Sequence, residues 1–184
     1  KDVGVEEFDY IPVEPGSAKP AGFKSTPSPD TSAINAALAL IRQARRPLLY
    51  VGGGAISCGA HEQVHQLAER FRLPVTTTLM GKGAFDEQHP LAVGMLGMHG
   101  TAYANFAVTE CDLLIAAGAR FDDRVTGRLD SFAPRAQVIH IDIDAAEVGK
   151  NRVPEVPVVA DVKQALEQLL AASEGDGSAG RTEA

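Results

Sequence analysis

Short apolar segments alternate with amphipathic helical segments through residues 31–172, and this alternation restricts the fold more than any other feature of the sequence. The helical segments carry apolar residues at intervals of three and four, as in Val64, Leu67, Ala68 and Phe71. The predicted strands cover residues 48–51, 73–77, 91–95, 113–117, 137–143 and 156–160, and the predicted helices cover 31–44, 60–71, 101–109 and 162–170. Such a pattern is typical of a parallel sheet buried on both faces. We therefore expect a three-layer, Rossmann-like α/β fold with a parallel sheet of about six strands and helices on both faces.

The two ends of the chain differ in composition from this body. Residues 1–30 contain five prolines among glycine, serine, threonine and acidic residues, which predicts an interdomain linker or a surface arm. Residues 173–184 are rich in glycine and small polar residues, which predicts a flexible tail. The folded body is thus expected to be one domain over residues 31–172.

The charge and composition exclude several classes of partner. The formal net charge of -7 removes the diffuse attraction on which nucleic-acid binding depends, so we expect no nucleic-acid partner. No segment is apolar over the length of a bilayer, and no secretory leader is recognisable, so no membrane partner is expected. The two cysteines, Cys58 and Cys111, lie far apart outside any metal-ligand spacing and are interpreted as buried, reduced thiols. No metal site is predicted on this chain.

A run of three glycines follows the first predicted strand. Gly52, Gly53 and Gly54 stand where backbone amides can approach a phosphate group at the carboxyl edge of a parallel sheet. The third glycine of a nicotinamide-dinucleotide fingerprint is replaced by Ser57, and Thr76-Thr77-Thr78 stands where a ribose-binding acid would end the second strand. An ordinary NAD site is therefore disfavoured, and a tight turn that binds nothing is the alternative interpretation.

Two other loops carry candidate binding residues at the same edge. In Gly118–Gly127, Arg120 and Arg124 lie among carboxylates, which suits phosphate recognition. The alternative is a loop that is held together by its own Arg/Asp ion pairs and binds no ligand. The segment Gly94–Gly100 combines two methionines with glycines and His99, which suits a flat ring, although these residues are also typical of core packing and a loop histidine. Asp142 follows as a candidate ribose acceptor, with a solvated edge residue as the alternative.

Together these segments resemble the central domain of the acetohydroxyacid synthase family, also called acetolactate synthase, whose members depend on thiamine diphosphate. The resemblance covers residues 31–172 and is carried by four segments in order, which are residues 50–56, 73–85, 95–100 and 118–127. It implies an FAD-binding site on this domain, with no catalytic residue in it. The cofactor-binding residues it implies are Gly52, Gly53, Gly54, Thr78, Leu79, Gly97, Met98, His99, Gly118, Ala119, Arg120, Asp122, Arg124, Val125, Asp142, Ile143, Asp161 and Val162.

The resemblance also implies the activity of a larger enzyme. That enzyme decarboxylates pyruvate on thiamine diphosphate and condenses the product with a second pyruvate or with 2-ketobutyrate, in branched-chain amino-acid biosynthesis. Thiamine diphosphate and Mg²⁺ are held by domains outside this chain, so the isolated chain is expected to form no acetolactate. The implied partners are other domains and subunits of the same enzyme, in a homo-oligomer with a possible regulatory subunit. The implied compartment is the cytoplasm in a bacterium, or a plastid or mitochondrion in a eukaryote.

Two alternatives remain open on the sequence. One is a stand-alone nucleotide-binding or structural module whose flavin pocket is vestigial. The other is the central domain of a related thiamine enzyme such as pyruvate oxidase, in which FAD accepts electrons.

Overall fold

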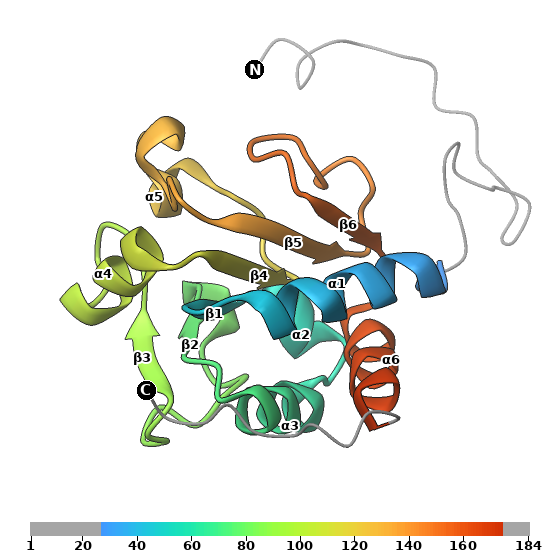
Figure 1. Ribbon diagram of the computed structural model, residues 1–184. Helices are drawn as coiled ribbons and strands as arrows, with labels where there is room; N and C mark the ends of the chain where they lie inside the picture. The colour runs from blue at the N-terminus through green and yellow to red at the C-terminus, as the bar shows by residue number, and fades with distance from the viewer. Residues whose placement is uncertain (1–26, 175–184) are drawn as a thin grey trace, which may run out of the picture.

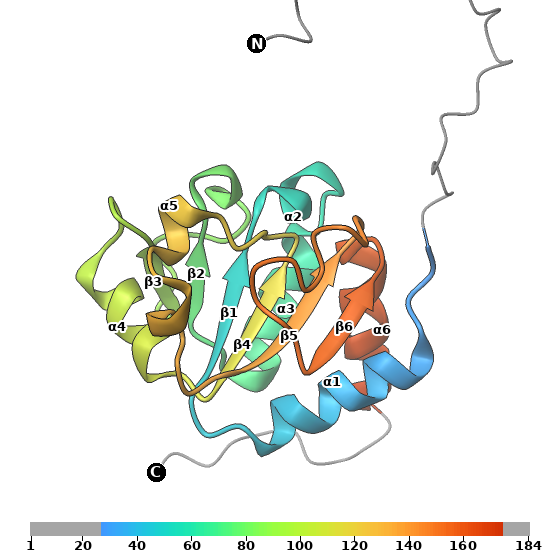
Figure 2. The same cartoon turned by 90° about the horizontal axis from the view of Figure 1, so that it is seen from above.

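The computed structural model describes residues 27–174 and contains a single six-stranded sheet within that range. The strand order is β3-β2-β1-β4-β5-β6, and every neighbouring pair is parallel. The strands are β1 (Pro47–Val51), β2 (Val75–Thr77), β3 (Ala92–Met95), β4 (Leu113–Ala117), β5 (Gln137–Asp142) and β6 (Val156–Val159). Figure 2 shows them side by side, with β3 and β6 at the edges. The predicted all-parallel sheet is confirmed.

Helices cover both faces of this sheet, as the sequence predicts. The helices are α1 (Thr31–Gln43), α2 (Gly53–Ser57), α3 (His61–Phe71), α4 (Ala102–Glu110), α5 (Asp123–Thr126) and α6 (Val162–Glu174), with 3-10 turns η2 (Leu79–Gly81) and η3 (Leu129–Ser131). Apolar residues of α1, α3 and α6 share one core cluster with Leu49, Val51 and Ile115. Residues of α4 and of the segment 119–136 share a second cluster with Leu48 and Tyr50. Figure 1 shows α3 and α6 below the strands and α5 above them.

The alternation of strand side chains explains these two clusters. Successive residues of β1 point to opposite faces, so Leu48 and Tyr50 join one cluster while Leu49 and Val51 join the other. All five residues of β1 and all five of β4 are buried, as expected for the central strands of a sheet covered on both sides. The order of the strands places β1 and β4 side by side, with the chain running outward from them in both directions.

Two short helices were missed by the sequence predictions. Helix α2 begins inside the glycine run and α5 spans four residues, so neither is long enough to show helical periodicity. Helix α6 runs to Glu174, two residues into the predicted tail, because Ser173 is buried and its hydroxyl donates to the Leu170 carbonyl. The rest of the predicted tail, and residues 1–26 of the predicted arm, lie outside the described residues. No helix in residues 27–174 is long and apolar enough to cross a bilayer.

Candidate functional site

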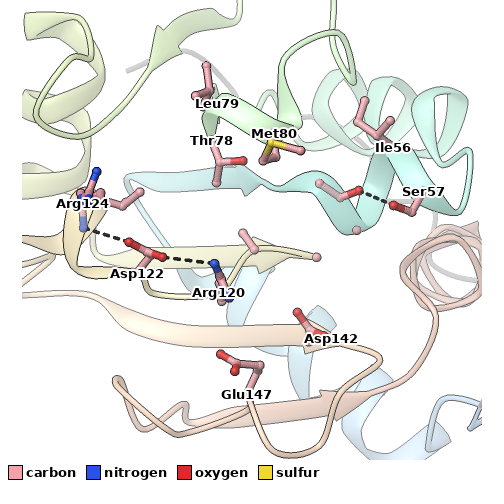
Figure 3. A pocket seen from close by; sticks show the side chains of 15 residues that line it. Ile56, Ser57, Thr78, Leu79, Met80, Arg120, Asp122, Arg124, Asp142 and Glu147 are labelled. Carbon is pink, nitrogen blue, oxygen red and sulfur yellow. Dashed lines mark hydrogen bonds and ion pairs between the residues drawn. The ribbon is translucent and has the colours of Figure 1, made fainter. Parts of the chain in front are cut away.

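A cavity of about 620 Å³ lies at the carboxyl ends of β1, β2, β4 and β5 (Figure 3). This is the position at which open parallel sheets bind ligands, because loops diverge where the strand order reverses between β1 and β4. Its wall is formed by Gly53, Gly54, Ile56, Ser57, Thr78, Leu79, Met80, Gly118, Ala119, Arg120, Asp122, Arg124, Val125, Asp142 and Glu147. The volume lies within the range of about 300–1,000 Å³ that is typical of small-molecule sites.

The glycine run after β1 forms one side of this cavity. A Cβ on Gly52 would lie 2.1 Å from the Gly118 oxygen, and a Cβ on Gly54 would lie 2.7 Å from the Gly118 Cα. The amides of Gly52 and Gly54 donate to the carbonyls of Ala117 and Gly118, both at 3.0 Å. Two of these glycines are therefore required for contact with the β4 loop, and their amides are already occupied. The sequence interpretation assigned these amides to a phosphate, and for Gly52 and Gly54 the packing of the two loops provides a sufficient reason.

The end of β2 supplies a partly apolar wall. The Thr78 hydroxyl accepts a hydrogen bond from the Gly81 amide at 2.9 Å and so caps the turn η2. This cap presents Leu79 and Met80 at the mouth of the cavity, where they are 70% and 75% exposed. Large apolar side chains with this exposure offer a surface for a flat ring or for another part of the protein.

The loop after β4 supplies the charged groups. Asp122 accepts a hydrogen bond from the Arg124 amide at 3.0 Å, which caps α5, and its carboxylate lies 3.4 Å from the Arg120 guanidinium. Figure 3 shows Arg120, Asp122 and Arg124 along one wall of the cavity. The Arg124 amide is the main cause of the lowered pKa of Asp122, and the two arginine charges also favour the carboxylate. Asp122 thus remains charged and orients Arg120, whose side chain is 67% exposed and available to an anion.

The end of β5 provides carboxylates on another wall. Asp142 accepts a hydrogen bond from the Asp144 amide through Oδ1 at 2.9 Å, which leaves its second oxygen for other donors. Glu147 reaches the cavity from the following loop and pairs with Lys150 at 2.8 Å. This loop is held down by Asn151, which donates to the Phe121 carbonyl at 2.6 Å. The cavity therefore combines a guanidinium pair with carboxylates, an arrangement that suits a ligand with an anionic centre and a hydroxylated end.

Comparison with known proteins agrees with this geometry. A model of the family described as "Thiamine pyrophosphate enzyme, central domain" matches residues 34–169, which is most of the chain. This chain belongs to that family. The central domain is 67% identical over 170 residues to the acetolactate synthase large subunit of Parasynechococcus marenigrum (strain WH8102), covering 92% of this chain and 28% of that protein. It is 62% identical to the acetolactate synthase of Arthrospira platensis, covering 92% of this chain and 30% of that protein.

A further relative, the acetolactate synthase large subunit of Porphyra purpurea, is 58% identical, covering 92% of this chain and 29% of that protein. The central domain thus spans less than a third of the length of the curated relatives that it matches. The resemblance to acetolactate synthases that the motifs suggested is confirmed.

Most of the predicted binding residues of the central domain line this cavity. They come from the loops after β1, β2, β4 and β5, and they are Gly53, Gly54, Thr78, Leu79, Gly118, Ala119, Arg120, Asp122, Arg124, Val125 and Asp142. We expected these loops to meet along a single rim of the sheet, and they do meet there. The contact of each residue with a ligand stays a prediction.

The predicted residues Gly97, Met98 and His99 lie beside the cavity rather than in its wall. The Met98 amide donates to the Arg124 carbonyl at 3.4 Å, and a Cβ on Gly97 would lie 3.1 Å from the same oxygen. Asn105 holds this segment by hydrogen bonds to both the amide and the carbonyl of Gly97, each at 3.1 Å. The segment therefore extends the rim past Arg124, with Met98 76% exposed.

Four other predicted residues are also outside the wall of the cavity. Gly52 sits beneath the loop contact described above, and Ile143 points largely to solvent, with 51% exposure. Asp161 accepts a hydrogen bond from the Gln164 amide at 3.1 Å and caps α6, whereas the Val162 side chain is buried in the core. The Ala160 amide donates to the Asp142 carbonyl at 2.9 Å, which keeps the start of α6 close to the β5 end of the cavity.

The sequence reasoning missed Ile56, Ser57, Met80 and Glu147, which also line the cavity. Ser57 stands where a nicotinamide-dinucleotide fingerprint has its third glycine, and this difference could have marked it as a site residue. Its hydroxyl donates to the Gly53 carbonyl at 3.0 Å. Met80 follows the predicted Leu79 directly and could have been included for that reason. Glu147 gives no local signal, because its position depends on how the loop after β5 folds back.

Proposed function

We propose that this central domain binds FAD in the cavity at the carboxyl ends of β1, β2, β4 and β5, as part of an acetolactate synthase. One observation carries the proposal. Residues that the motif resemblance assigned to FAD, and that are scattered from Gly53 to Asp142 in the sequence, line a single cavity at the position where this fold binds nucleotides.

The residues present fit FAD better than a smaller nucleotide. Arg120 and Arg124 suit the diphosphate because a guanidinium binds phosphate oxygens with two donors. The free oxygen of Asp142 suits a ribose hydroxyl, and the exposed Leu79 and Met80 suit the flat, partly apolar flavin ring. NAD is less well matched, because β2 ends in Thr77 and the following Thr78 hydroxyl is committed to its cap. By the same resemblance, the flavin supplies structural support without a required redox role.

The full enzyme that we infer condenses pyruvate with a second pyruvate or with 2-ketobutyrate on thiamine diphosphate. The motif resemblance implies no catalytic residue on this domain, so the role we assign to it is cofactor binding. Thiamine diphosphate, Mg²⁺ and the subunit contacts, including any regulatory subunit, are assigned to other parts of the enzyme. We expect the purified chain with thiamine diphosphate and Mg²⁺ to form no acetolactate, and a colorimetric acetoin assay checks this.

The alternatives are less well supported. Identity of 58–67% to acetolactate synthases over nearly the whole chain favours a synthase over a pyruvate oxidase. A vestigial pocket in a stand-alone module would have no reason to keep two arginines and three carboxylates around one cavity. Loss of flavin absorbance when pyruvate is added to the full-length protein would instead support the oxidase.

The test is a titration with FAD, NAD and ADP, followed by flavin fluorescence and melting temperature, on this chain and on the full-length protein. We expect FAD to raise the melting temperature, because a ligand that binds only the folded state stabilises it. Arg120→Ala and Arg124→Ala should each weaken FAD binding about tenfold or more, since each removes charge-assisted hydrogen bonds. Arg128→Ala is the matched control, because Arg128 pairs with Asp130 in the same loop and lies outside the cavity wall. Equal FAD affinity in all three variants would overturn the proposal.

A further inference from the structure

A cluster of two histidines and one glutamate lies far from the cofactor cavity in the fold. His65 and Glu69 lie one turn apart on α3, and His89 belongs to the turn that leads into β3. The Glu69 carboxylate lies between the two rings, with Oε2 3.8 Å from His65 Nδ1 and Oε1 3.4 Å from His89 Nε2. One candidate ligand atom from each residue falls within 4.8 Å of the other two. The cluster is near the amino ends of β2 and β3, whereas the cavity is at the carboxyl ends of the strands.

The packing around the cluster holds both imidazoles in place. The buried ring of Phe85 lies 5.8 Å from the His65 ring and 4.9 Å from the His89 ring, measured between centroids. The two imidazoles meet edge to face at 5.3 Å. The His89 side chain is only 19% exposed, whereas His65 and Glu69 are reachable from solvent at 42% and 56%. The three groups therefore converge without free rotation of either ring, and one side remains open.

The donor set and its spacing match a tetrahedral transition-metal ion. Two imidazole nitrogens and one carboxylate oxygen form a common set for Zn²⁺ when a water completes the shell. Adjacent ligand atoms around tetrahedral zinc lie about 3.4 Å apart, and here one candidate atom from each of the three residues lies within 4.8 Å of the other two, so the atoms must draw together by on the order of 1 Å at most. Hard ions such as Mg²⁺ and Ca²⁺ prefer six or more oxygens and do not suit this set.

We propose that His65, Glu69 and His89 form a binding site for a zinc-like divalent ion that clamps α3 to the segment entering the edge strand β3. One feature limits the affinity. His89 Nδ1 accepts a hydrogen bond from the Leu91 amide at 3.2 Å, so the Nε2 that faces Glu69 carries the proton of the neutral ring. Metal binding at Nε2 requires the proton of the neutral ring to move to Nδ1, which gives up the hydrogen bond from the Leu91 amide. The loss of this bond offsets part of the metal-ligand energy, so we expect affinity only on the order of micromolar.

The test uses the tag-free chain in a buffer without chelators. Isothermal titration with ZnCl₂ is expected to show one ion per chain, and Co²⁺ is expected to give the visible absorption of a tetrahedral complex. Zn²⁺ should raise the melting temperature, because it binds the folded arrangement of two separate segments. Glu69→Gln and His89→Ala should each weaken binding at least tenfold, since each removes one of three ligands.

His61→Ala is the matched control, because His61 is an exposed histidine at the start of the same helix and outside the cluster. This variant should bind Zn²⁺ like the unchanged chain. Circular dichroism of each variant without metal confirms that it is folded, and Glu69→Gln keeps the shape of the side chain if His89→Ala fails this check. Absence of micromolar binding by the unchanged chain would overturn the proposal. Binding by Glu69→Gln or His89→Ala that equals that of His61→Ala would also overturn it. FAD titration of the same variants should be unaffected, which separates this site from the cofactor cavity.

Discussion

Replacing Gly52 by alanine tests whether the glycine run is required by the fold itself. Gly52 has an extended backbone, with φ -110° and ψ -174°, so alanine can adopt its conformation without strain. The methyl group is the whole difference. It would lie 2.1 Å from the Gly118 oxygen, 2.5 Å from the Ala119 Cα and 2.7 Å from the Ala119 Cβ. These are mainly backbone atoms of the adjoining loop, which cannot move aside as the end of a flexible side chain could.

The expected cost follows from these contacts. Overpacking of a tight site costs about 1–3 kcal/mol. The loops must also separate, which weakens the bonds from the Gly52 and Gly54 amides to Ala117 and Gly118, each worth about 0.5–1.5 kcal/mol. Alanine also lowers the conformational entropy of the unfolded chain, which stabilises the folded state by about 0.4–1 kcal/mol. The net loss is about 3 kcal/mol, which corresponds to a melting temperature lower by about 6–12 °C for a domain of this size.

Gly53→Ala is the matched control for this loss. Its Cβ would lie 3.1 Å from the Cβ of Met80, so the turn that carries this exposed residue has to move by only a few tenths of an ångström. We expect a change in unfolding free energy within about 1 kcal/mol. Because Gly53 lines the cavity, the added methyl group should weaken FAD binding while leaving the fold intact. Differential scanning calorimetry without ligand measures both variants. A melting temperature of Gly52→Ala within about 2 °C of the unchanged protein, or equal losses in both variants, would refute the steric argument.

Two further predictions concern single side chains. Burial lowers the pKa of His140 below its ordinary value of 6.5, so the folded protein keeps this ring neutral while the unfolded chain protonates it. Stability should therefore fall as the pH drops below about 6.5, by at most about 1.4 kcal/mol per pH unit from this group, and His140→Met should show a shallower loss between pH 7 and 5.5 in urea unfolding. An unchanged slope would contradict this assignment. Asp161→Ala should lower the free energy of unfolding by about 1 kcal/mol even without FAD, because Asp161 caps α6. Asp161→Asn should retain the cap. Equal chemical-denaturation midpoints for the two variants would exclude the capping role.

The cofactor cavity shows where reasoning from sequence succeeds and where it stops. Arg120, Asp122 and Asp142 could be assigned to one rim because each follows a strand, and the carboxyl ends of parallel strands share an edge. Ser57 and Met80 were within reach of the same reasoning. Glu147 was not, because the loop that carries it is placed by Asn151 and Phe121, whose contact spans thirty positions of the chain.

The pattern of apolar residues by itself determined the parallel sheet, its six strands and the four longer helices. This is because a buried strand or helix face produces a regular spacing of apolar residues in the nearby sequence. Only the tertiary structure decided what individual residues of the loops do. It committed the Gly52 and Gly54 amides to the β4 loop, turned Val162 into the core, and brought His89 against α3 beside His65 and Glu69. Each of these outcomes depends on contacts between segments distant in sequence, which no local pattern encodes.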